Sequence, residues 1–263
     1  MVRTTRLKVL LPCLAALLLL GAEVPAAGQG ILLDARVSLD AYRAAVDARL
    51  GGVLIGTRTL AASGDVRSGD WGRMRPSLAG LAGSVEEQAA VWFAGPDGSY
   101  STVEKGPTGE SLRDRAYFPS LLAGRDVVGA LVISKSTGKR SLIVASPVIV
   151  DGKVVGAVGV SLDAARLAAS MDRVIRLPPD FVLYALDSHG QTALHRTGEL
   201  IFAFPSDVGS PTLAYAVKTM LGEPEGVIEY RYAGSDRTAL FERSELTGWV
   251  LVLGKVHPAA VTP

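Results

Sequence analysis

The chain has 263 residues, of which 48% are hydrophobic and 20% charged, so it has the composition of a folded protein with a hydrophobic core and not of a disordered one. Its length suits one large domain or two modest ones. The formal net charge of +1 gives no electrostatic reason to expect nucleic acid or an anionic membrane surface as a partner.

The N-terminal residues 1–26 predict a cleaved secretory signal peptide. Arg3, Arg6 and Lys8 precede an apolar run at 9–20, and the small residues that follow at 24–27 suit a signal peptidase. The run is short for a membrane span, which makes an uncleaved anchor the less favoured alternative. We therefore expect a periplasmic or secreted protein.

Cleavage changes both the charge and the cysteine content of the chain. Removing three cations and Glu23 moves the formal charge from +1 to +1 − 3 + 1 = −1. The single cysteine, Cys13, leaves with the signal peptide. The mature protein is therefore expected to use neither disulfides nor thiolate chemistry.

Two helices are predicted ahead of the first strand. Apolar residues recur every three, four or seven positions over 39–60, which is the stripe of a long helix, with Ser38 and Asp40 at its N-terminal cap. The pair Gly51-Gly52 weakens this helix by about 1 kcal/mol per glycine relative to alanine. A second helix is expected after Asp70 as its cap.

Three consecutive β-branched runs carry the most structural information. They cover 127–134, 141–150 and 154–162, and turn signals at 136–138 and 151–152 separate them. This pattern predicts an antiparallel meander of three strands.

The residues upstream of this meander predict a hairpin and a covering segment. Strands are expected at 89–94 and 100–103, followed by a loop at 105–109. A short apolar run at 118–123 is expected to cross the edge of the sheet as a helix or loop.

The same arrangement occurs a second time in the chain. Gly138 and Gly152 lie fourteen residues apart in the first meander, and Gly234 and Gly248 have the same spacing in a second one. A hairpin-like segment, 181–195, precedes the second copy. The repeat predicts an α+β fold in which a long N-terminal helix is followed by two related modules in tandem, each an antiparallel sheet with flanking helices.

The boundary between the modules is expected at Pro178-Pro179. Asp163 can cap a helix that ends before these prolines, and Ser210 can cap a helix within the second module. The predicted divisions are the signal peptide 1–26, N-terminal helices 27–84, a first module 85–177, a second module 178–256 and a tail 257–263.

Arg115 is the leading candidate for a ligand-binding residue. A guanidinium beside Tyr117 and Phe118 can grip a carboxylate with two hydrogen bonds while the aromatic rings exclude water. The alternative is a salt bridge from Arg115 to Asp114 or Glu110 that only fixes the loop. The other candidate residues, each with a plain structural alternative as core or surface, are Trp92, Tyr100, Ser134, Ser146 and Ser161.

The chain resembles the double Cache family of extracytoplasmic sensor domains, whose modules are PAS-like. The resemblance rests on the signal peptide, the long helix, the Arg-Ala-Tyr-Phe sequence at 115–118, the meander ending in DGKVVGAVGVSL and the TGWVLV sequence at 247–252. It implies that a small ligand binds in the first, membrane-distal module and that the second module is membrane-proximal.

The chain departs from the family pattern in two respects. No transmembrane helix or output domain follows Val256, so we expect a separate membrane-bound partner: a histidine kinase, a chemoreceptor or a cyclase. The amino-acid-binding subgroup is expected to have a Tyr five residues before the Arg and an Asp in the last strand. Here those positions hold Glu110 and Ser161, which leaves the ligand open. A homodimer through the N-terminal helix is a further partnership that this organisation allows.

No enzymatic activity, cofactor or metal is expected. The sequence has no G-x-S-x-G, H-E-x-x-H or dinucleotide-binding motif. His189 and His195 are six residues apart across a predicted turn with no further His or Cys nearby, so a metal site is disfavoured. The competing functional class is a structural or adaptor module whose pocket is filled by its own side chains.

Overall fold

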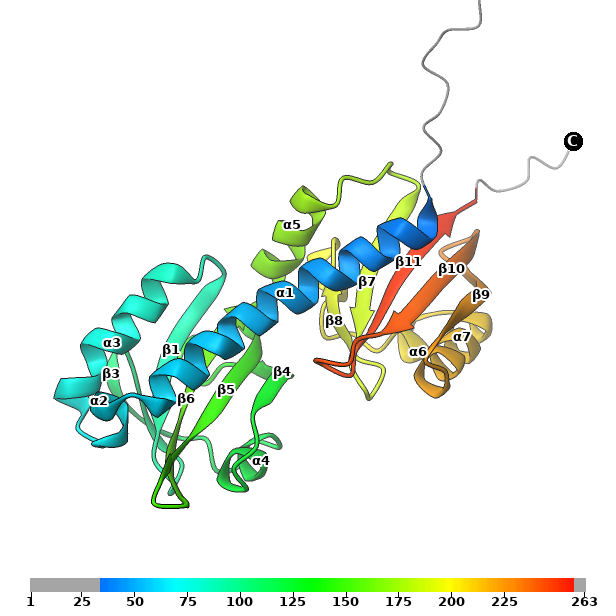
Figure 1. The fold of residues 1–263 in the computed structure, drawn as a ribbon. Helices are drawn as coiled ribbons and strands as arrows, with labels where there is room; N and C mark the ends of the chain where they lie inside the picture. Colours follow the sequence, from blue (N-terminus) through cyan, green and yellow to red (C-terminus); the bar gives the residue numbers. More distant parts are fainter. Residues whose placement is uncertain (1–33, 258–263) are drawn as a thin grey trace, which may run out of the picture. The chain divides into compact units, whose positions relative to one another are not determined.

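The computed structural model describes residues 34–257, so the predicted signal peptide, Cys13 and residues 258–263 of the tail lie outside the described part. The described residues form the predicted α+β fold, a long helix followed by two antiparallel sheets with flanking helices (Figure 1). Among residues 34–257, no helix combines the length and apolarity that crossing a membrane requires.

The long helix α1 (Ala35–Ala62) begins four residues before its hydrophobic stripe. Its N-cap is Asp34, whose carboxylate accepts hydrogen bonds from the amides of Arg36 and Val37. The predicted cap at Ser38 and Asp40 is therefore wrong, because the apolar stripe marks only the buried face and not the first turn. The helix continues through both glycines in its middle, since its buried face packs against both sheets.

The two shorter helices after α1 cover the first sheet. They are α2 (Gly64–Arg67) and α3 (Trp71–Ser84). Asp70 caps α3 as predicted, and its carboxylate accepts a hydrogen bond from the amide of Gly72. The α3 helix packs against the first strand of the sheet.

The first sheet has six strands in the order β3-β2-β1-β6-β5-β4. The predicted loop at 105–109 is wrong, because β3 pairs there with β2. Pro107 is tolerated because β3 is an edge strand, where a residue whose nitrogen faces solvent does not need to donate a hydrogen bond to a neighbouring strand. The elements of this module are β1 (Gln88–Ala94), β2 (Ser99–Thr102), β3 (Gly106–Ser111), α4 (Phe118–Leu122), β4 (Val127–Ile133), β5 (Arg140–Val150) and β6 (Lys153–Asp163).

The second sheet has five strands in the order β8-β7-β11-β10-β9. Helix α5 (Ala164–Val174), capped by Asp163 as predicted, leads into it. The remaining elements are β7 (Phe181–Leu186), β8 (Thr192–His195), η1 (Gly198–Leu200), α6 (Pro205–Val208), α7 (Pro211–Gly222), β9 (Glu225–Tyr232), β10 (Ser235–Arg243) and β11 (Val250–Val256).

The internal repeat is confirmed by the strand pairing. In each sheet the first hairpin strand pairs with the last meander strand, β1 with β6 and β7 with β11. The four glycines that reveal the repeat all occupy turns with positive φ, between 71° and 80°, a conformation that side chains disfavour. The same turns therefore recur at the same places in both modules.

Helix α1 shares one hydrophobic core with both sheets. One face of each sheet packs with α1 in a single buried cluster, while the opposite faces form separate clusters. Two ion pairs add to this packing. The Nε of Arg49 donates to Glu87 just before β1, and the Nε of Arg43 donates to Glu242 in β10, each at 2.7 Å. Both carboxylates are buried.

Candidate functional site

The aromatic candidates of the first module lie together. Trp92 from β1, Tyr100 from β2, and Tyr117 and Phe118 at the start of α4 belong to one buried cluster on the sheet face turned away from α1. Their exposed fractions are all 8% or lower. The structure therefore places these four predicted residues on one face of the first module.

The indole of Trp92 occupies the centre of that face. Trp92 pairs across the ladder with Gly159 of β6, and a Cβ built on Gly159 would lie 2.1 Å from the Cζ2 atom of the indole. The indole Nε1 also donates a hydrogen bond to the hydroxyl of Ser161 at 3.2 Å. The ring therefore lies flush against the glycine backbone, held by a buried polar contact.

The three candidate serines lie in three different places and do not form one site. Ser161 shares the aromatic face, because it pairs with Ile143, a member of the same cluster. Ser146 lies on the opposite face, where its hydroxyl is 2.9 Å from that of Thr57 in α1. Ser134 follows the end of β4, and its hydroxyl accepts a hydrogen bond from the amide of Thr137 in the turn. The predicted strand placement of Ser134 is wrong by one residue.

The guanidinium of Arg115 lies at the edge of the aromatic face. One of its terminal nitrogens donates to the carbonyl oxygen of Ile133 at 2.6 Å. Neither predicted salt bridge forms among the described residues, since Asp114 pairs instead with Lys135 at 2.8 Å. This ion pair lowers the pKa of Asp114, chiefly through the hydrogen bond from Lys135.

Arg115 and Tyr117 line a cleft that also borders the second module. The cleft offers about 500 Å³ to the centres of water-sized molecules, and its far wall contains the turn after β7 and Trp249. Burial raises the pKa of Tyr117, so its phenol stays protonated in neutral solution. The cleft thus combines a cation, a phenol, apolar strand residues and two carboxylates, those of Asp114 and Asp187.

Trp249 fixes one wall of this cleft. It is 2% exposed, and its ring packs against Gly129 in β4, where a Cβ would lie 2.7 Å from Cζ2. Gly129 has a φ of 83° at a break in the register with β5, so both the conformation and the contact require glycine. The cleft is therefore bounded by a fixed contact between the two modules.

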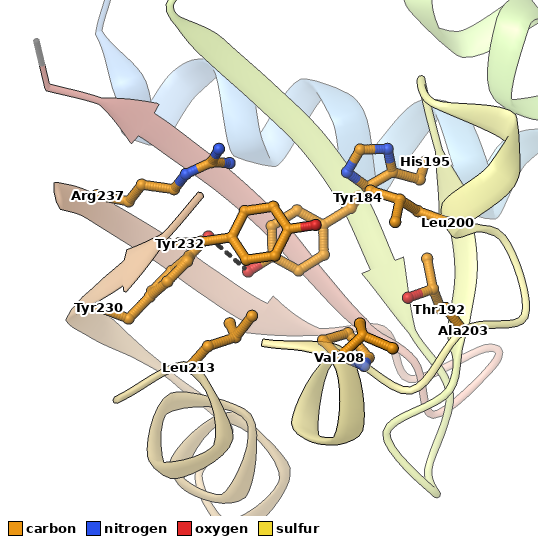
Figure 2. Close-up of a pocket in the computed structure, with 11 residues that line it drawn as sticks. Tyr184, Thr192, His195, Leu200, Ala203, Val208, Leu213, Tyr230, Tyr232 and Arg237 are labelled. Carbon is orange, nitrogen blue, oxygen red and sulfur yellow. Dashed lines mark hydrogen bonds between the residues drawn. The ribbon is translucent and has the colours of Figure 1, made fainter. Parts of the chain in front are cut away.

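The second module contains a smaller cavity on its face turned away from α1 (Figure 2). The cavity has about 50 Å³ that can hold the centre of a water-sized molecule, and the 450 Å³ free of protein atoms around it includes open solvent at the mouth. Tyr184, Tyr230 and Tyr232 line it together with His195 and Arg237. We did not predict these residues as a site, although Tyr230 and Tyr232 are two apart in a strand and so share a face.

The two histidines considered as metal ligands do not converge. His189 is an exposed turn residue 3.5 Å from Asp187, whereas His195 ends β8 and lines the cavity of the second module. Within residues 34–257, no group of three or more His, Cys, Asp or Glu side chains could hold a metal ion.

Solved structures with the same fold include extracellular and ligand binding domains of receptors. The extracellular ligand binding receptor from Desulfohalobium retbaense DSM5692 is 16% identical with a TM-score of 0.65, and the match covers 85% of this chain but only 40% of that one. The ligand binding domain of the amino acid chemoreceptor PctB from Pseudomonas aeruginosa PAO1, solved with L-Arg, is 18% identical with a TM-score of 0.67 over 84% of this chain and 93% of that one.

A third structure extends the comparison to kinases. The extracellular domain rpHK1S-Z16, described as that of a histidine kinase, is 15% identical with a TM-score of 0.70 over 85% of this chain and 92% of that one. At these identities the likeness establishes the fold alone. Among curated proteins, none matches this chain in sequence.

A family model provides the sequence-level assignment. The model for the Cache domain matches residues 33–260, which include α1 and both sheets. This extent agrees with the duplicated sheet unit and with the resemblance inferred from the sequence motifs. The chain belongs to the Cache domain family, in its double Cache form with two PAS-like modules in tandem.

Proposed function

We propose that this protein is an extracytoplasmic sensor that binds a small carboxylate-bearing metabolite at Arg115 of the first module. The proposal rests on one observation above all. Arg115 and Tyr117 line a cleft of ligand size at the edge of a buried aromatic face. Family membership supports the sensory role, because the Cache neighbours are ligand-binding and signalling domains.

The Arg115 guanidinium has N–H donors that make no hydrogen bond within residues 34–257 and can bind a carboxylate. Its one hydrogen bond among residues 34–257 goes to the carbonyl oxygen of Ile133, and the adjacent carboxylate of Asp114 is already paired with Lys135. A bidentate bond from Arg115 to a ligand carboxylate therefore requires no existing ion pair to break. The phenol of Tyr117 adds a further polar group beside it.

We propose a ligand that lacks an amino-acid ammonium group. The structural neighbour PctB was solved with L-Arg, but Ser161 stands where the resemblance leads us to expect an Asp in the amino-acid-binding subgroup. Its hydroxyl accepts a hydrogen bond from Trp92 and carries no charge to balance an ammonium. Ser161 does not itself line the cleft; of the two carboxylates that do, Asp114 is paired with Lys135 and Asp187 accepts hydrogen bonds from two amides of its own turn, so an ammonium would compete with these contacts.

A ligand bound in the cleft would contact residues of both modules. The cleft is lined by β4 residues on one side and by Asp187, His189 and Trp249 on the other. A ligand shifts the balance between two arrangements only through a difference in its affinity for them. Contacts with residues of both modules would supply such a difference, and a separate membrane-bound chemoreceptor, histidine kinase or cyclase would respond to the change.

The periplasmic or secreted location belongs to the same proposal. Export with cleavage near residue 26 predicts a mature protein that lacks Cys13. Mass measurement of the exported protein would show the cleavage, whereas an intact N-terminus would contradict it.

Thermal shift of the whole protein against a panel of carboxylic acids tests the site. A ligand at 100 times its Kd stabilises the folded state by about 2.7 kcal/mol, which raises Tm by about 5–11 °C for a chain of this size. We expect Arg115→Ala to abolish this rise and Arg115→Lys to retain part of it. Arg113→Ala, which removes an exposed neighbouring cation, is the matched control and should leave the rise intact. An undiminished rise with Arg115→Ala would remove Arg115 from the role.

A structural or adaptor module is the second candidate. The packing of Trp92 against Gly159 favours it, because side chains already fill the centre of the first-module face. If no fraction of a metabolite pool raises the Tm of the protein, this candidate replaces the sensor.

A further inference from the structure

The cavity of the second module contains a cation that lacks an anionic partner. Arg237, from β10, has its Nε buried without a hydrogen-bond acceptor in the described part of the chain. Its guanidinium carbon lies 4.9 Å from the ring centre of Tyr232, and no ion pair of Arg237 is found among residues 34–257. A buried donor without an acceptor destabilises the folded state, and a ligand oxygen that accepts a hydrogen bond from it would recover that loss.

His195 presents a second donor beside the cavity. Its Nδ1 accepts a hydrogen bond from the backbone amide of Thr197 at 2.9 Å, so the proton of the neutral imidazole lies on Nε2. Burial, with the positive charges of Arg237 and Arg196, lowers the pKa of His195 to about 4. The ring is therefore neutral at physiological pH and is a donor through Nε2.

The tyrosine hydroxyls are further polar groups of this cavity, and no acidic residue lines it. The hydroxyls of Tyr184 and Tyr230 lie 3.3 Å apart, joined by the dashed line in Figure 2, and burial keeps Tyr184 protonated by raising its pKa. None of the eleven residues that line the cavity is Asp or Glu. A positively charged group would find no counter-charge here, whereas an anion would meet Arg237.

The remaining walls are apolar and the mouth lies beside α6. Leu200, Val208 and Leu213 surround the space opposite the guanidinium (Figure 2). Val208 is 59% exposed, which places it at the rim. Small-molecule sites typically have this combination of apolar walls and a few convergent polar groups.

We propose that this cavity is a second ligand site, distinct from the Arg115 cleft, for a small monocarboxylic acid with an apolar body. The carboxylate pairs with Arg237 and accepts from His195 or a tyrosine hydroxyl, and the hydrocarbon body lies against the leucine and valine side chains. A free amino acid is excluded from this class because its ammonium would sit near Arg237 with no acidic partner. This site draws on none of the residues of the proposed function.

Calorimetric titration of the whole protein tests this site with matched probes. Benzoate and isovalerate supply an aromatic and a branched body with the carboxylate, benzamide is the neutral counterpart of benzoate, and benzylamine is the cationic one. We expect at least one acid to bind, benzamide to bind at least about 10-fold more weakly, and benzylamine not to bind, because losing a charged hydrogen-bond partner costs about that factor or more.

Variants assign the binding to this cavity. Arg237→Gln should weaken acid binding at least about 10-fold, the loss of a charge-assisted hydrogen bond. Val208→Trp should block the mouth without disturbing the core, which keeps the test valid if the arginine variant fails to fold. Arg115→Gln should leave this binding unchanged. Binding of neither acid, equal binding of benzoate and benzamide, or binding lost in Arg115→Gln but kept in Arg237→Gln would each overturn the proposal. The last outcome would support the Arg115 site instead, so the two proposals fail separately.

Discussion

Substituting Gly159 with alanine tests directly whether an indole fills the first-module face. The new methyl group would lie 2.1 to 2.5 Å from three atoms of the Trp92 ring, against about 3.5–4.0 Å for an ordinary carbon contact. The ring must therefore move by more than 1 Å, on the order of the difference between these distances. Such a movement would also stretch the hydrogen bond from Trp92 to Ser161, now 3.2 Å long.

The cost follows from these two losses. Overpacking of a well-packed core costs about 1–3 kcal/mol, and a lost buried hydrogen bond adds about 1 kcal/mol. The Gly159→Ala variant should therefore be destabilised by about 2–4 kcal/mol, which lowers Tm by about 4–16 °C for a chain of this size. Thermal and urea unfolding followed by circular dichroism would measure both quantities.

Two comparisons make this result specific. Gly52→Ala, in the exposed middle of α1 with no atom within 4 Å of the new methyl, should instead stabilise the protein by up to about 1 kcal/mol. Adding Trp92→Leu to Gly159→Ala should cost less than the sum of the two single changes, because the clash is gone. If Gly159→Ala unfolds like the parent protein, or the double change is additive, the indole does not occupy that face.

Three further predictions concern polar groups that are buried or line the cavity of the second module. Thr57→Val should destabilise the protein by about 1–3 kcal/mol in urea unfolding, because it leaves the buried hydroxyl of Ser146 without its partner. Adding Ser146→Ala should restore most of the lost stability. A double variant as unstable as the single one would contradict the pairing. The pKa of His195 is lowered to about 4 from its ordinary value of 6.5. Between pH 4 and pH 6.5 the unfolded chain therefore binds a proton that the folded protein does not bind. The free energy of unfolding should fall by up to about 3 kcal/mol as the pH falls from about 6.5 to about 4. Arg237→Gln should raise the pKa of His195, which NMR titration of the imidazole would measure, and an unchanged pKa would place the two groups apart.

Local sequence patterns were sufficient to predict the repeated sheet unit. Alternating β-branched residues and turn glycines act through neighbouring residues, so the three meander strands and the turns at Gly138 and Gly234 could be predicted without coordinates. The caps at Asp70 and Asp163 were predictable for the same reason. The start of α1 was not, because Asp34 caps a first turn that has no buried stripe.

Which surfaces are filled and which stay open depends on residues far apart in the chain. Sequence spacing places Trp92 on a strand face, but only the pairing of β1 with β6 brings it over Gly159. Likewise Ser146 is a strand residue by pattern, and the position of α1 decides that it meets Thr57 and not the aromatic face. The cavity at Arg237 exists because β8, β9, β10 and the segment around α6 enclose a space that their side chains do not fill. The periodicity of the sequence shows which residues share a face of a strand or helix. What covers that face is decided by packing between segments far apart in the chain, because it depends on how the volumes of their side chains fit together.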